Sequence, residues 1–382
     1  MTNETPSKEI SRRSFLNRMG RGLVAANLVT SPLLRAAQSQ AVGPDPPGKK
    51  LGWAIVGLGG LAMRQILPAF AKCEKSKVTA LVSGHPDKAY KLALRYGVDP
   101  KHIYNYDNYD SIKNDPEVDV IYIVLPNGMH AEYTIRGLQA AKHVLCEKPM
   151  ANTSADCQKM IDAARAANRK LMVAYRCRYE PYNREAIRIV HSGELGPTQT
   201  ILTNAGWHID NPDQWRLKKD LAGGGSLMDI GIYALNAARY LSGEEPSEVN
   251  AMMYSTPGDP RFKEVEENVN FQLRFPSGVL ANCSSSYGYY HQSHFRVLGT
   301  TGLLELDPAT WYSGLRLRVQ HGTVFEEREL PVVDHFAAEM DHLSGCVMDN
   351  KEVLTPGEEG LRDLKIMMAI YEAARAAKTV KL

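Results

Sequence analysis

Trp53-Ala-Ile-Val-Gly-Leu-Gly-Gly-Leu-Ala62 is the stretch that decides the fold of this chain. It has the pattern of a buried strand, a glycine turn and the start of a helix. Gly57, Gly59 and Ala62 fit G-x-G-x-x-G/A: the first glycine permits a tight turn, the second lets the backbone approach a pyrophosphate, and the small third residue lets helix and strand pack. The flanking apolar run and amphipathic stretch favour dinucleotide binding over a plain structural turn.

Predicted strands and helices alternate from residue 51 to about residue 175. The apolar runs that predict strands cover 51–56, 78–82, 120–125, 143–146 and 171–174. Helical periodicity falls between them, near 60–72, 86–96, 129–141 and 153–168. Such alternation predicts a parallel sheet with helices on both faces. We therefore expect residues 51–175 to form an α/β Rossmann domain that binds a dinucleotide.

The pattern changes after about residue 176. Apolar and polar residues alternate over 269–275, and a similar alternation continues over 279–287. This pattern predicts strands with one buried and one solvent-exposed face. The strand patterns on either side of Gly299-Thr-Thr-Gly302 predict a hairpin.

Two helices are expected in this second part, one after the glycines at 223–225 and one over about 357–377. Residues 176–382 therefore predict an α+β domain with a large open, mostly antiparallel sheet and helices on one face. We expect this domain to bind substrate and to form oligomers, and its C-terminal helix to pack on the first domain.

The first 41 residues resemble an export signal. Ser11-Arg-Arg-Ser-Phe-Leu16 is similar to a twin-arginine motif. The apolar stretch 22–34 is too short and too polar for a stable membrane anchor, and small residues up to Ala41 suit a peptidase. The alternative is a basic amphipathic helix that stays attached. We expect the twin-arginine machinery to export the folded protein to the periplasm, with residues 42–50 as a proline-rich arm.

Charge argues against nucleic acid as a partner. Of 45 basic and 43 acidic residues, six basic and two acidic lie in 1–41, so the rest of the chain carries a net charge of −2. The cysteines show no C-x-x-C and no metal-ligand spacing, which predicts neither a metal site nor a disulfide framework. They are Cys73, Cys146, Cys157, Cys177, Cys283 and Cys346.

The end of the second expected strand indicates which dinucleotide binds. NAD enzymes usually carry Asp or Glu there to bind the ribose 2′-hydroxyl. In Val82-Ser-Gly-His-Pro-Asp-Lys88 that position is Ser83, and Lys88 opens the next helix. Because a hydroxyl and a cation suit a 2′-phosphate better than a carboxylate does, we infer tightly but non-covalently bound NADP. The alternative is a solvated Lys88 on a helix face.

Two later strand ends carry polar residues at the edge where such sheets bind ligands. Leu125-Pro-Asn-Gly-Met-His130 is expected to cover the nicotinamide-ribose side, although Asn127 and His130 also fit a helix cap and an ordinary surface residue. In Cys146-Glu-Lys-Pro-Met150, we expect Lys148 to point into the cleft. There it can hydrogen-bond a substrate hydroxyl and lower the pKa of a neighbouring acid–base group.

The segment Leu221-Ala-Gly-Gly-Gly-Ser-Leu-Met-Asp-Ile-Gly-Ile-Tyr233 supplies a candidate acid–base group. If it is helical, Asp229 and Tyr233 stand at i and i+4 on one face. A phenol with a reference pKa of about 10 needs a nearby cation to work near neutrality, and Lys148 is the candidate. Asp229 would orient a sugar hydroxyl or the tyrosine. The glycine run allows close approach and favours this interpretation over a capped helix with an ordinary buried tyrosine.

Longer motifs resemble those of the Gfo/Idh/MocA oxidoreductase family over nearly all of the chain after residue 50, and its glucose–fructose oxidoreductase branch has the most similar motifs. The motifs are Ala54-Ile-Val-Gly-Leu-Gly59, Ala80-Leu-Val-Ser-Gly84, Cys146-Glu-Lys-Pro-Met150, Tyr175-Arg-Cys-Arg-Tyr-Glu-Pro181, Gln214-Trp-Arg-Leu217, Ala222-Gly-Gly-Gly-Ser-Leu-Met-Asp-Ile-Gly-Ile-Tyr233, Asp307-Pro-Ala-Thr310 and Pro356-Gly-Glu-Glu-Gly360.

The resemblance implies a catalytic group of Lys148, Asp229 and Tyr233, with Tyr233 as the acid–base. Substrate contacts would come from Lys148, Arg176, Asp229, Tyr233 and Tyr312. Cofactor contacts would come from Gly57, Leu58, Gly59, Gly60, Leu61, Ala62, Ser83, Gly84, Lys88, Tyr106, Leu125, Pro126, Asn127, His130, Glu147, Lys148, Arg176, Trp215 and Arg216. It further implies a homo-oligomer, tetramer or dimer, joined through the open sheets. The arm at 42–50 is shorter than the arm with which the relatives wrap a neighbour's nucleotide.

The expected export and the expected NADP cofactor together predict a reaction that needs no supply of free nucleotide. Because no pool of free NADP is maintained outside the cytoplasm, an exported enzyme must regenerate its nucleotide in place. We therefore expect ping-pong hydride transfer from an aldose C1, such as glucose to gluconolactone, to a second sugar, such as fructose to sorbitol. The alternatives are a conventional periplasmic aldose dehydrogenase, an aldose–aldose oxidoreductase, and a non-catalytic NADP-loaded sugar-binding protein.

Overall fold

The computed structural model describes residue 48 and residues 50–382. The predicted export signal, 1–41, and most of the proline-rich arm lie outside the described residues. In the part that is described, no helix is long and apolar enough to cross a membrane, and no cluster of side chains has the composition of a metal site. All six cysteines are buried, free thiols.

Six parallel strands form the first sheet, in the order β3-β2-β1-β4-β5-β6. They are β1 (Leu51–Val56), β2 (Ser76–Val82), β3 (Ile103–Tyr104), β4 (Val120–Ile123), β5 (His143–Cys146) and β6 (Leu171–Val173). The predicted Rossmann sheet is confirmed, with β3 as an additional strand too short to show a hydrophobic period. Because β1 pairs with both β2 and β4, the strand order reverses there and opens a crevice at the strands' carboxyl ends.

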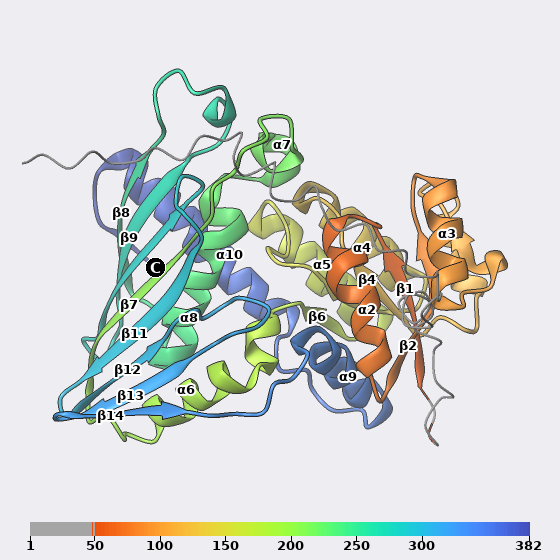
Figure 1. The fold of residues 1–382 in the computed structure, drawn as a ribbon. Helices are drawn as coiled ribbons and strands as arrows, with labels where there is room; N and C mark the ends of the chain where they lie inside the picture. The colour runs from red at the N-terminus through yellow and green to blue at the C-terminus, as the bar shows by residue number, and fades with distance from the viewer. Residues whose placement is uncertain (1–47, 49) are drawn as a thin grey trace, which may run out of the picture. The chain divides into compact units, whose positions relative to one another are not determined.

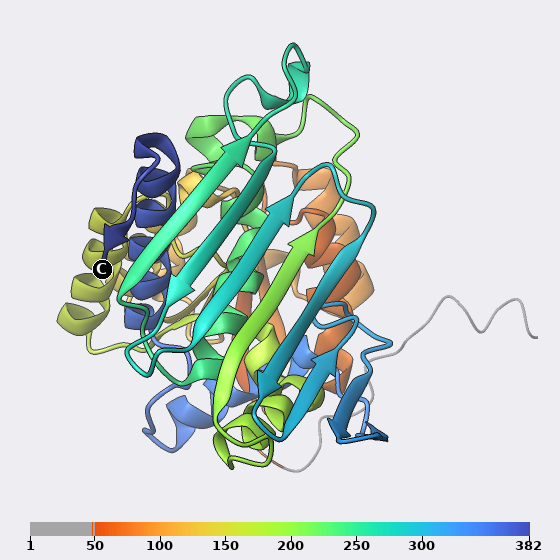
Figure 2. The same cartoon turned by 90° about the vertical axis from the view of Figure 1, so that its left-hand side faces the viewer.

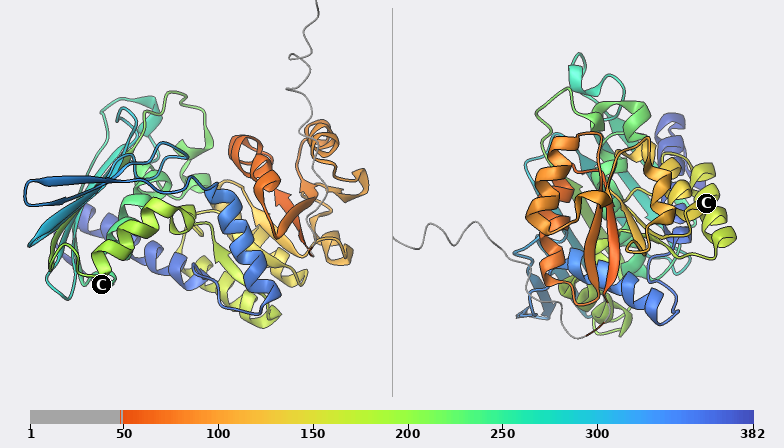
Figure 3. Two further views of the ribbon diagram at one scale, coloured as in Figure 1. Left: turned by 60° about the horizontal axis from the view of Figure 1, so that its bottom comes forward. Right: turned by 90° about the vertical axis from the view of Figure 1, so that its right-hand side faces the viewer.

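Helices cover both faces of this sheet (Figure 3). Alternate residues of β1 enter two different cores, so Trp53 and Ile55 face one helical layer and Ala54 and Val56 face the other. The first layer contains α9 (His335–Met348) and a helix made of η2 (Ala62–Ile66), α2 (Leu67–Ala69) and η3 (Phe70–Lys72). The second contains α4 (His130–Gln139) and α5 (Ser154–Ala167), while α3 (Pro86–Tyr96) follows β2.

Nine strands form the second sheet, in the order β14-β13-β12-β11-β7-β10-β9-β8-β15. All pairs are antiparallel except β7 with β10, which confirms the predicted mostly antiparallel sheet. The strands are β7 (Thr198–Gly206), β8 (Glu248–Tyr254), β9 (Asn268–Arg274), β10 (Leu280–Ser286), β11 (Gln292–Gly299), β12 (Gly302–Leu306), β13 (Leu317–His321), β14 (Val324–Arg328) and β15 (Val380–Lys381).

One face of the second sheet carries helices and the other does not. Helices α6 (Pro181–His191), α8 (Ile232–Ser242) and α10 (Gly357–Ala376) lie along one face in Figure 1. Figure 2 looks onto the opposite face, which no helix of residues 50–382 covers. The alternation in β9 fits this arrangement, because Phe271 is buried while Gln272 is exposed. Helix α10 also contacts α5 and β6, so it bridges the two sheets.

A buried ion network ties α8 to α10. The Arg239 guanidinium, with a side chain 4% exposed, lies 2.5 Å from the Asp363 carboxylate and 2.9 Å from that of Glu359. Its second terminal nitrogen, Nη2, is 2.6 Å from the carboxylate of Glu245. Because α8 carries the candidate acid–base tyrosine, this network holds the second domain's site element against the helix that reaches the first domain.

Replacing Arg239 with methionine should lower the free energy of unfolding by about 3–5 kcal/mol, because it leaves buried carboxylates without their cation. Urea denaturation followed by circular dichroism measures the change. The matched control is Arg188→Met, which removes a 54%-exposed arginine paired with Glu185 and should cost about 0–1 kcal/mol. Equal losses in the two variants would contradict the importance of the buried network.

Candidate active site

The glycine turn after β1 has the geometry of a phosphate-binding turn. Gly57 has a φ of +95°, and a Cβ there would collide with the carbonyl oxygen of Val124. At Gly59, by contrast, a Cβ would meet no atom within 4 Å. The turn is therefore closed toward the sheet and open on its outer side, at the start of the following helix. This arrangement fits a dinucleotide, whose pyrophosphate would lie against the Gly59 backbone and the helix N-terminus.

A cation and an aromatic ring lie beside this turn. The Lys88 ammonium is 3.4 Å from the carbonyl oxygen of Leu58, and no carboxylate of the described residues pairs with it. The Tyr106 ring packs against Gly84, where an added Cβ would lie 3.2 Å from its Cε2 atom. The hydroxyl of the buried Ser83 accepts a hydrogen bond from the His85 N–H at 3.0 Å, so it shapes the turn at the end of β2.

Two polar side chains of the loop after β4 contact the protein's own backbone. His130 is fully buried, and its two ring nitrogens each lie 2.8 Å from a carbonyl oxygen, of Pro149 and of Leu125. The imidazole therefore fastens the loop after β5 to the loop after β4, which leaves no ring nitrogen for a nucleotide. Asn127 is also buried, and its amide donates to the Ala222 carbonyl at 2.9 Å. Both side chains bind protein backbone here.

Lys148, Asp229 and Tyr233 lie together. The Lys148 ammonium donates to the backbone carbonyl of Asp229 at 2.5 Å and lies 3.8 Å from its carboxylate. The same ammonium is 4.7 Å from the centre of the Tyr233 ring. The Lys148–Pro149 peptide is cis. The three residues of the expected catalytic group thus share one site, although they come from β5 and from the helix of the second domain.

The helix that carries the acid and the tyrosine begins with a π-helical turn. Asp229 lies in η9 (Leu227–Gly231), and Tyr233 follows in the first turn of α8. A second π turn, η2, comes directly after the phosphate-binding turn. Single π turns inside longer helices occur frequently at functional sites.

The glycine run before this helix brings protein, rather than ligand, into close approach. A Cβ at Gly224 would collide with the Tyr371 hydroxyl, and one at Gly225 with the backbone of Glu266. The Glu266 carboxylate accepts from the N–H groups of Gly225 at 2.8 Å and Leu227 at 3.0 Å. It therefore caps the N-terminus of the catalytic helix. The sequence gives no sign of this cap, because Glu266 lies 41 positions after Gly225, in an irregular loop.

Asp229 is held as a carboxylate. Burial opposes its ionisation, but the guanidinium of Arg216 and the ammonium of Lys148 outweigh burial, so the pKa is lowered. Arg216 makes the closest contact, 3.1 Å from Nε to the carboxylate, and stacks on the Trp215 ring at 4.5 Å. The phenol of Tyr287, which the sequence analysis missed, also stabilises the charge.

Arg176 is the central buried cation of the site. Its guanidinium donates to the carbonyl of Thr310 at 2.5 Å and lies 5.1 Å and 4.7 Å from the ring centres of Tyr233 and Tyr312. It also contacts Nδ1 of His335 at 3.3 Å. Burial, helped by Arg176, lowers the pKa of His335 to about 4. The neutral ring donates from Nε2 to the Tyr312 carbonyl and accepts from Arg176 at Nδ1.

Tyr233 is a partly buried phenol whose pKa lies above its usual value. Burial raises it, and the guanidinium of Arg176 is the strongest opposing influence. The Tyr312 ring is 49% exposed on the far side of Arg176, which places it where a substrate would enter. A substrate hydroxyl that reaches Tyr233 would therefore lie within a group of cations and aromatic rings, suited to proton transfer at an alcohol or carbonyl oxygen.

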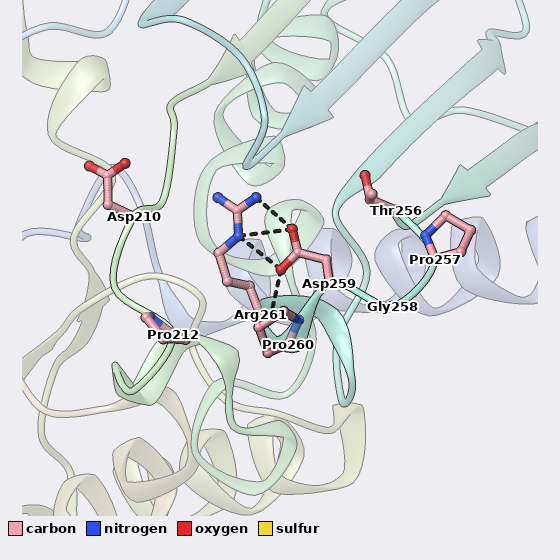
Figure 4. A pocket seen from close by; sticks show the side chains of 8 residues that line it. All are labelled: Asp210, Pro212, Thr256, Pro257, Gly258, Asp259, Pro260 and Arg261. Atoms are coloured by element: carbon pink, nitrogen blue, oxygen red, sulfur yellow. Dashed lines mark hydrogen bonds and ion pairs between the residues drawn. The ribbon is translucent and has the colours of Figure 1, made fainter.

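The hollow in Figure 4 is a separate feature of the second domain. Its cation, Arg261, is already paired with Asp259 at 2.6 Å. The catalytic residues do not line it; its lining residues are Asp210, Pro212, Thr256, Pro257, Gly258, Asp259, Pro260 and Arg261.

Two family descriptions match the chain. Residues 51–175 match "Oxidoreductase family, NAD-binding Rossmann fold", and residues 183–305 match "GFO/IDH/MocA C-terminal domain". D-xylose 1-dehydrogenase (NADP(+)) of Haloarcula marismortui is 32% identical over 336 residues, which cover 86% of this chain and 92% of that protein. The chain belongs to the Gfo/Idh/MocA oxidoreductase family. It is an oxidoreductase with the NAD(P)-binding Rossmann domain of that family.

Solved structures of oxidoreductases are also similar to this chain. Aldose-aldose oxidoreductase from Caulobacter crescentus, complexed with glycerol, has a TM-score of 0.86 and 50% identity, covering 87% of this chain and all of that one. A 3-ketoreductase from Actinomadura kijaniata, in complex with NADP and TDP-benzene, has a TM-score of 0.76 at 24% identity, covering 85% and 98%, and this likeness shows the fold alone.

Replacing Arg176 with methionine should shift the pH dependence of alcohol oxidation toward alkaline pH. Loss of the guanidinium raises the pKa of Tyr233 further, so less phenolate is available at any given pH. A shift of one pKa unit would slow oxidation near neutrality about tenfold. Stopped-flow rates of cofactor reduction against pH measure this. Arg178→Met, which removes a cation near the Tyr240 ring, is the control; matching profiles in both variants would contradict the assignment.

Proposed function

We propose that this NAD(P)-dependent sugar oxidoreductase carries its own NADP and transfers hydride between two sugars at one site. The observation that carries the proposal is the grouping of Lys148, Asp229 and Tyr233 with Arg176. The similarity to an aldose-aldose oxidoreductase and to an NADP(+)-dependent D-xylose dehydrogenase supports sugar substrates and NADP. Ser83 and Lys88, with no acid at the end of β2, support NADP over NAD.

In the first half-reaction an aldose such as glucose loses the two electrons of its C1–H bond as hydride. NADP, when bound, supplies the acceptor for this hydride and later returns it. The proton of the C1 hydroxyl goes to the Tyr233 phenolate, while Asp229 and Lys148 orient the sugar, which leaves as a lactone. The cationic Arg176 favours the phenolate that the step requires.

In the second half-reaction Tyr233 gives its proton to the carbonyl oxygen of a second sugar as hydride reaches the carbonyl carbon. The product is an alditol, and the sum is one aldose oxidised for one sugar reduced. The raised pKa of Tyr233 suits this half, because the phenol retains the proton between the two visits. An aldose is the acceptor that the 50% identity favours; fructose, reduced to sorbitol, is the acceptor that the motif resemblance favours.

The setting of the reaction belongs to the same proposal. Twin-arginine export of the folded, NADP-loaded protein to the periplasm explains why the nucleotide must be regenerated in place. The helix-free face of the nine-stranded sheet is the surface through which a homo-oligomer, dimer or tetramer, would form.

An ultraviolet spectrum of the mature protein, purified without added nucleotide, tests this function. A reduced-nicotinamide absorbance band that rises with glucose and falls when xylose or fructose is added supports the proposal. The sugar whose addition makes the band fall is the acceptor. A band that forms only after free NADP is supplied would instead establish a conventional aldose dehydrogenase. No band under either condition would establish a non-catalytic binder.

Replacing Tyr233 with phenylalanine should cut turnover by about 100-fold or more, because it removes the acid–base group and little else. Steady-state assays with saturating sugars measure the loss. Tyr290→Phe is the control, since that ring is 94% exposed and makes no contact with the cluster described above. Unchanged turnover in the Tyr233 variant would remove this residue from the chemistry.

Replacing Lys88 with alanine should weaken NADP binding about 10- to 100-fold and leave NAD binding unchanged, since a hydrogen bond to a charged group contributes about 1.5–3 kcal/mol. Fluorescence titration of nucleotide-stripped protein with each nucleotide measures both affinities. The control is Lys91→Ala, an exposed lysine on the same helix. Equal losses for NADP and NAD would show that Lys88 does not contact the 2′-phosphate.

A further inference from the structure

Two glutamates meet at one tyrosine hydroxyl behind the catalytic cluster. Tyr122, in the middle of β4, is 0% exposed, and so is Glu339 on α9. Glu147, at the end of β5 and directly before Lys148, is 8% exposed. The Tyr122 hydroxyl lies 2.7 Å from the Glu147 carboxyl and 3.2 Å from the Glu339 carboxyl. The proposed sugar chemistry makes no use of this group.

Hydrogen counting limits the protonation state of these three side chains. Two oxygen–oxygen hydrogen bonds need two hydrogens, and the Tyr122 hydroxyl supplies one. Two ionised carboxylates, which only accept, would have to divide the one phenol hydrogen in a bifurcated bond, whereas a carboxyl proton on one of them supplies a hydrogen for each contact. If Tyr122 donates along the shorter contact to Glu147, then Glu339 donates to the Tyr122 oxygen.

We propose that Glu339 and Glu147 share a single proton through Tyr122, with Glu339 as the neutral acid and Glu147 as the carboxylate beside Lys148. Glu339 is then a positioning residue: it holds Tyr122 so that the phenol hydrogen points at Glu147. The proposal concerns the protonation of this group alone and does not depend on which sugars react.

The surroundings of the pair favour this distribution. The second carboxyl oxygen of Glu339 is buried and makes no hydrogen bond within the described residues, a position that costs a neutral acid far less than a carboxylate. Burial raises the pKa of Glu339, and the charge of Glu147 raises it further. At Glu147 burial also raises the pKa, but Lys148, Tyr122 and Arg176 oppose it. The positive charges therefore lie nearer to Glu147.

The shared proton has a consequence for the site. Arg176 forms no ion pair with a carboxylate among the described residues, and its charge acts on both glutamates, lowering the pKa of Glu147 and of Glu339 against the effect of burial. A second negative charge on Glu339 would cancel the cations that oppose the raised pKa of Tyr233. The neutral Glu339 leaves those cations effective. The ionisable and polar groups that act on Glu339, or on which it acts, are Tyr122, Glu147, Arg176, Cys177, Tyr179 and Asp334.

Infrared difference spectroscopy tests the shared proton directly. The wild-type holoenzyme at pH 8 should show the carbonyl band of a protonated carboxylic acid, with the shift that deuterium oxide causes. Glu339→Gln should lose that band, because its amide N–H replaces the acid O–H. Asp341→Asn, on the same helix, is the matched control: its carboxyl accepts two backbone N–H groups, and its loss should remove only carboxylate bands.

Thermal stability against pH provides a second, independent measurement. The native state keeps a proton that the unfolded chain releases above the ordinary pKa of glutamate, so wild-type stability falls as pH rises. The melting temperature of Glu339→Gln should therefore exceed that of the wild type by a margin that widens from pH 5 to 8. If this variant does not fold, Tyr122→Phe replaces it: loss of the bridging hydroxyl should shift the acid band of the wild type, and an unshifted band would assign it to another carboxyl. The absence of an acid band from the wild type, or a constant margin, would overturn the proposal.

Discussion

The hydrogen bond from the Lys148 ammonium to the backbone carbonyl of Asp229, 2.5 Å long, is the contact on which the arrangement of the site depends. It joins the end of β5 to the start of the catalytic helix, 81 positions away in the sequence. That helix start is itself fixed, because the Glu266 carboxylate binds two of its N–H groups. The same ammonium lies over the Tyr233 ring. A displacement of either element would separate the cation from the phenol.

Burial acts on the two acids of this site with opposite outcomes. At Asp229, the nearby Arg216 and Lys148 outweigh the cost of burial, and the carboxyl stays ionised. At Tyr233, burial outweighs Arg176, and the phenol holds its proton more firmly than in water. When the surroundings shift the pKa values of two neighbouring groups in opposite directions, one group stays ionised and the other keeps its proton, so the two can take different roles in one reaction. In the proposed mechanism Asp229 is accordingly the fixed charge that orients the sugar, and Tyr233 is the group that carries the proton.

The residues that sequence reasoning identified share a local signal. Gly57 and Gly59 belong to a turn with a fixed spacing, and Lys148 stands in a Glu-Lys-Pro motif directly after a short strand. Glu266, His335 and Glu339 carry no such signal. Glu339 is an acidic residue in the middle of a helix, where a polar residue ordinarily indicates the solvent side, yet it is fully buried. Only the packing of α9 against the first sheet shows that it faces Tyr122 and Glu147.

The sequence by itself determined the Rossmann order of strands and helices and the glycine turn after the first strand, because these follow from hydrophobic period and from glycine spacing within a few positions; the candidate catalytic residues came from motifs. The tertiary structure decided which polar side chains form hydrogen bonds within the protein itself. The side chains of His130 and Asn127, for example, contact backbone carbonyls of neighbouring segments. The physical reason is that hydrogen-bond partners and desolvation depend on segments far apart in the chain, and local pattern carries no information about their distance.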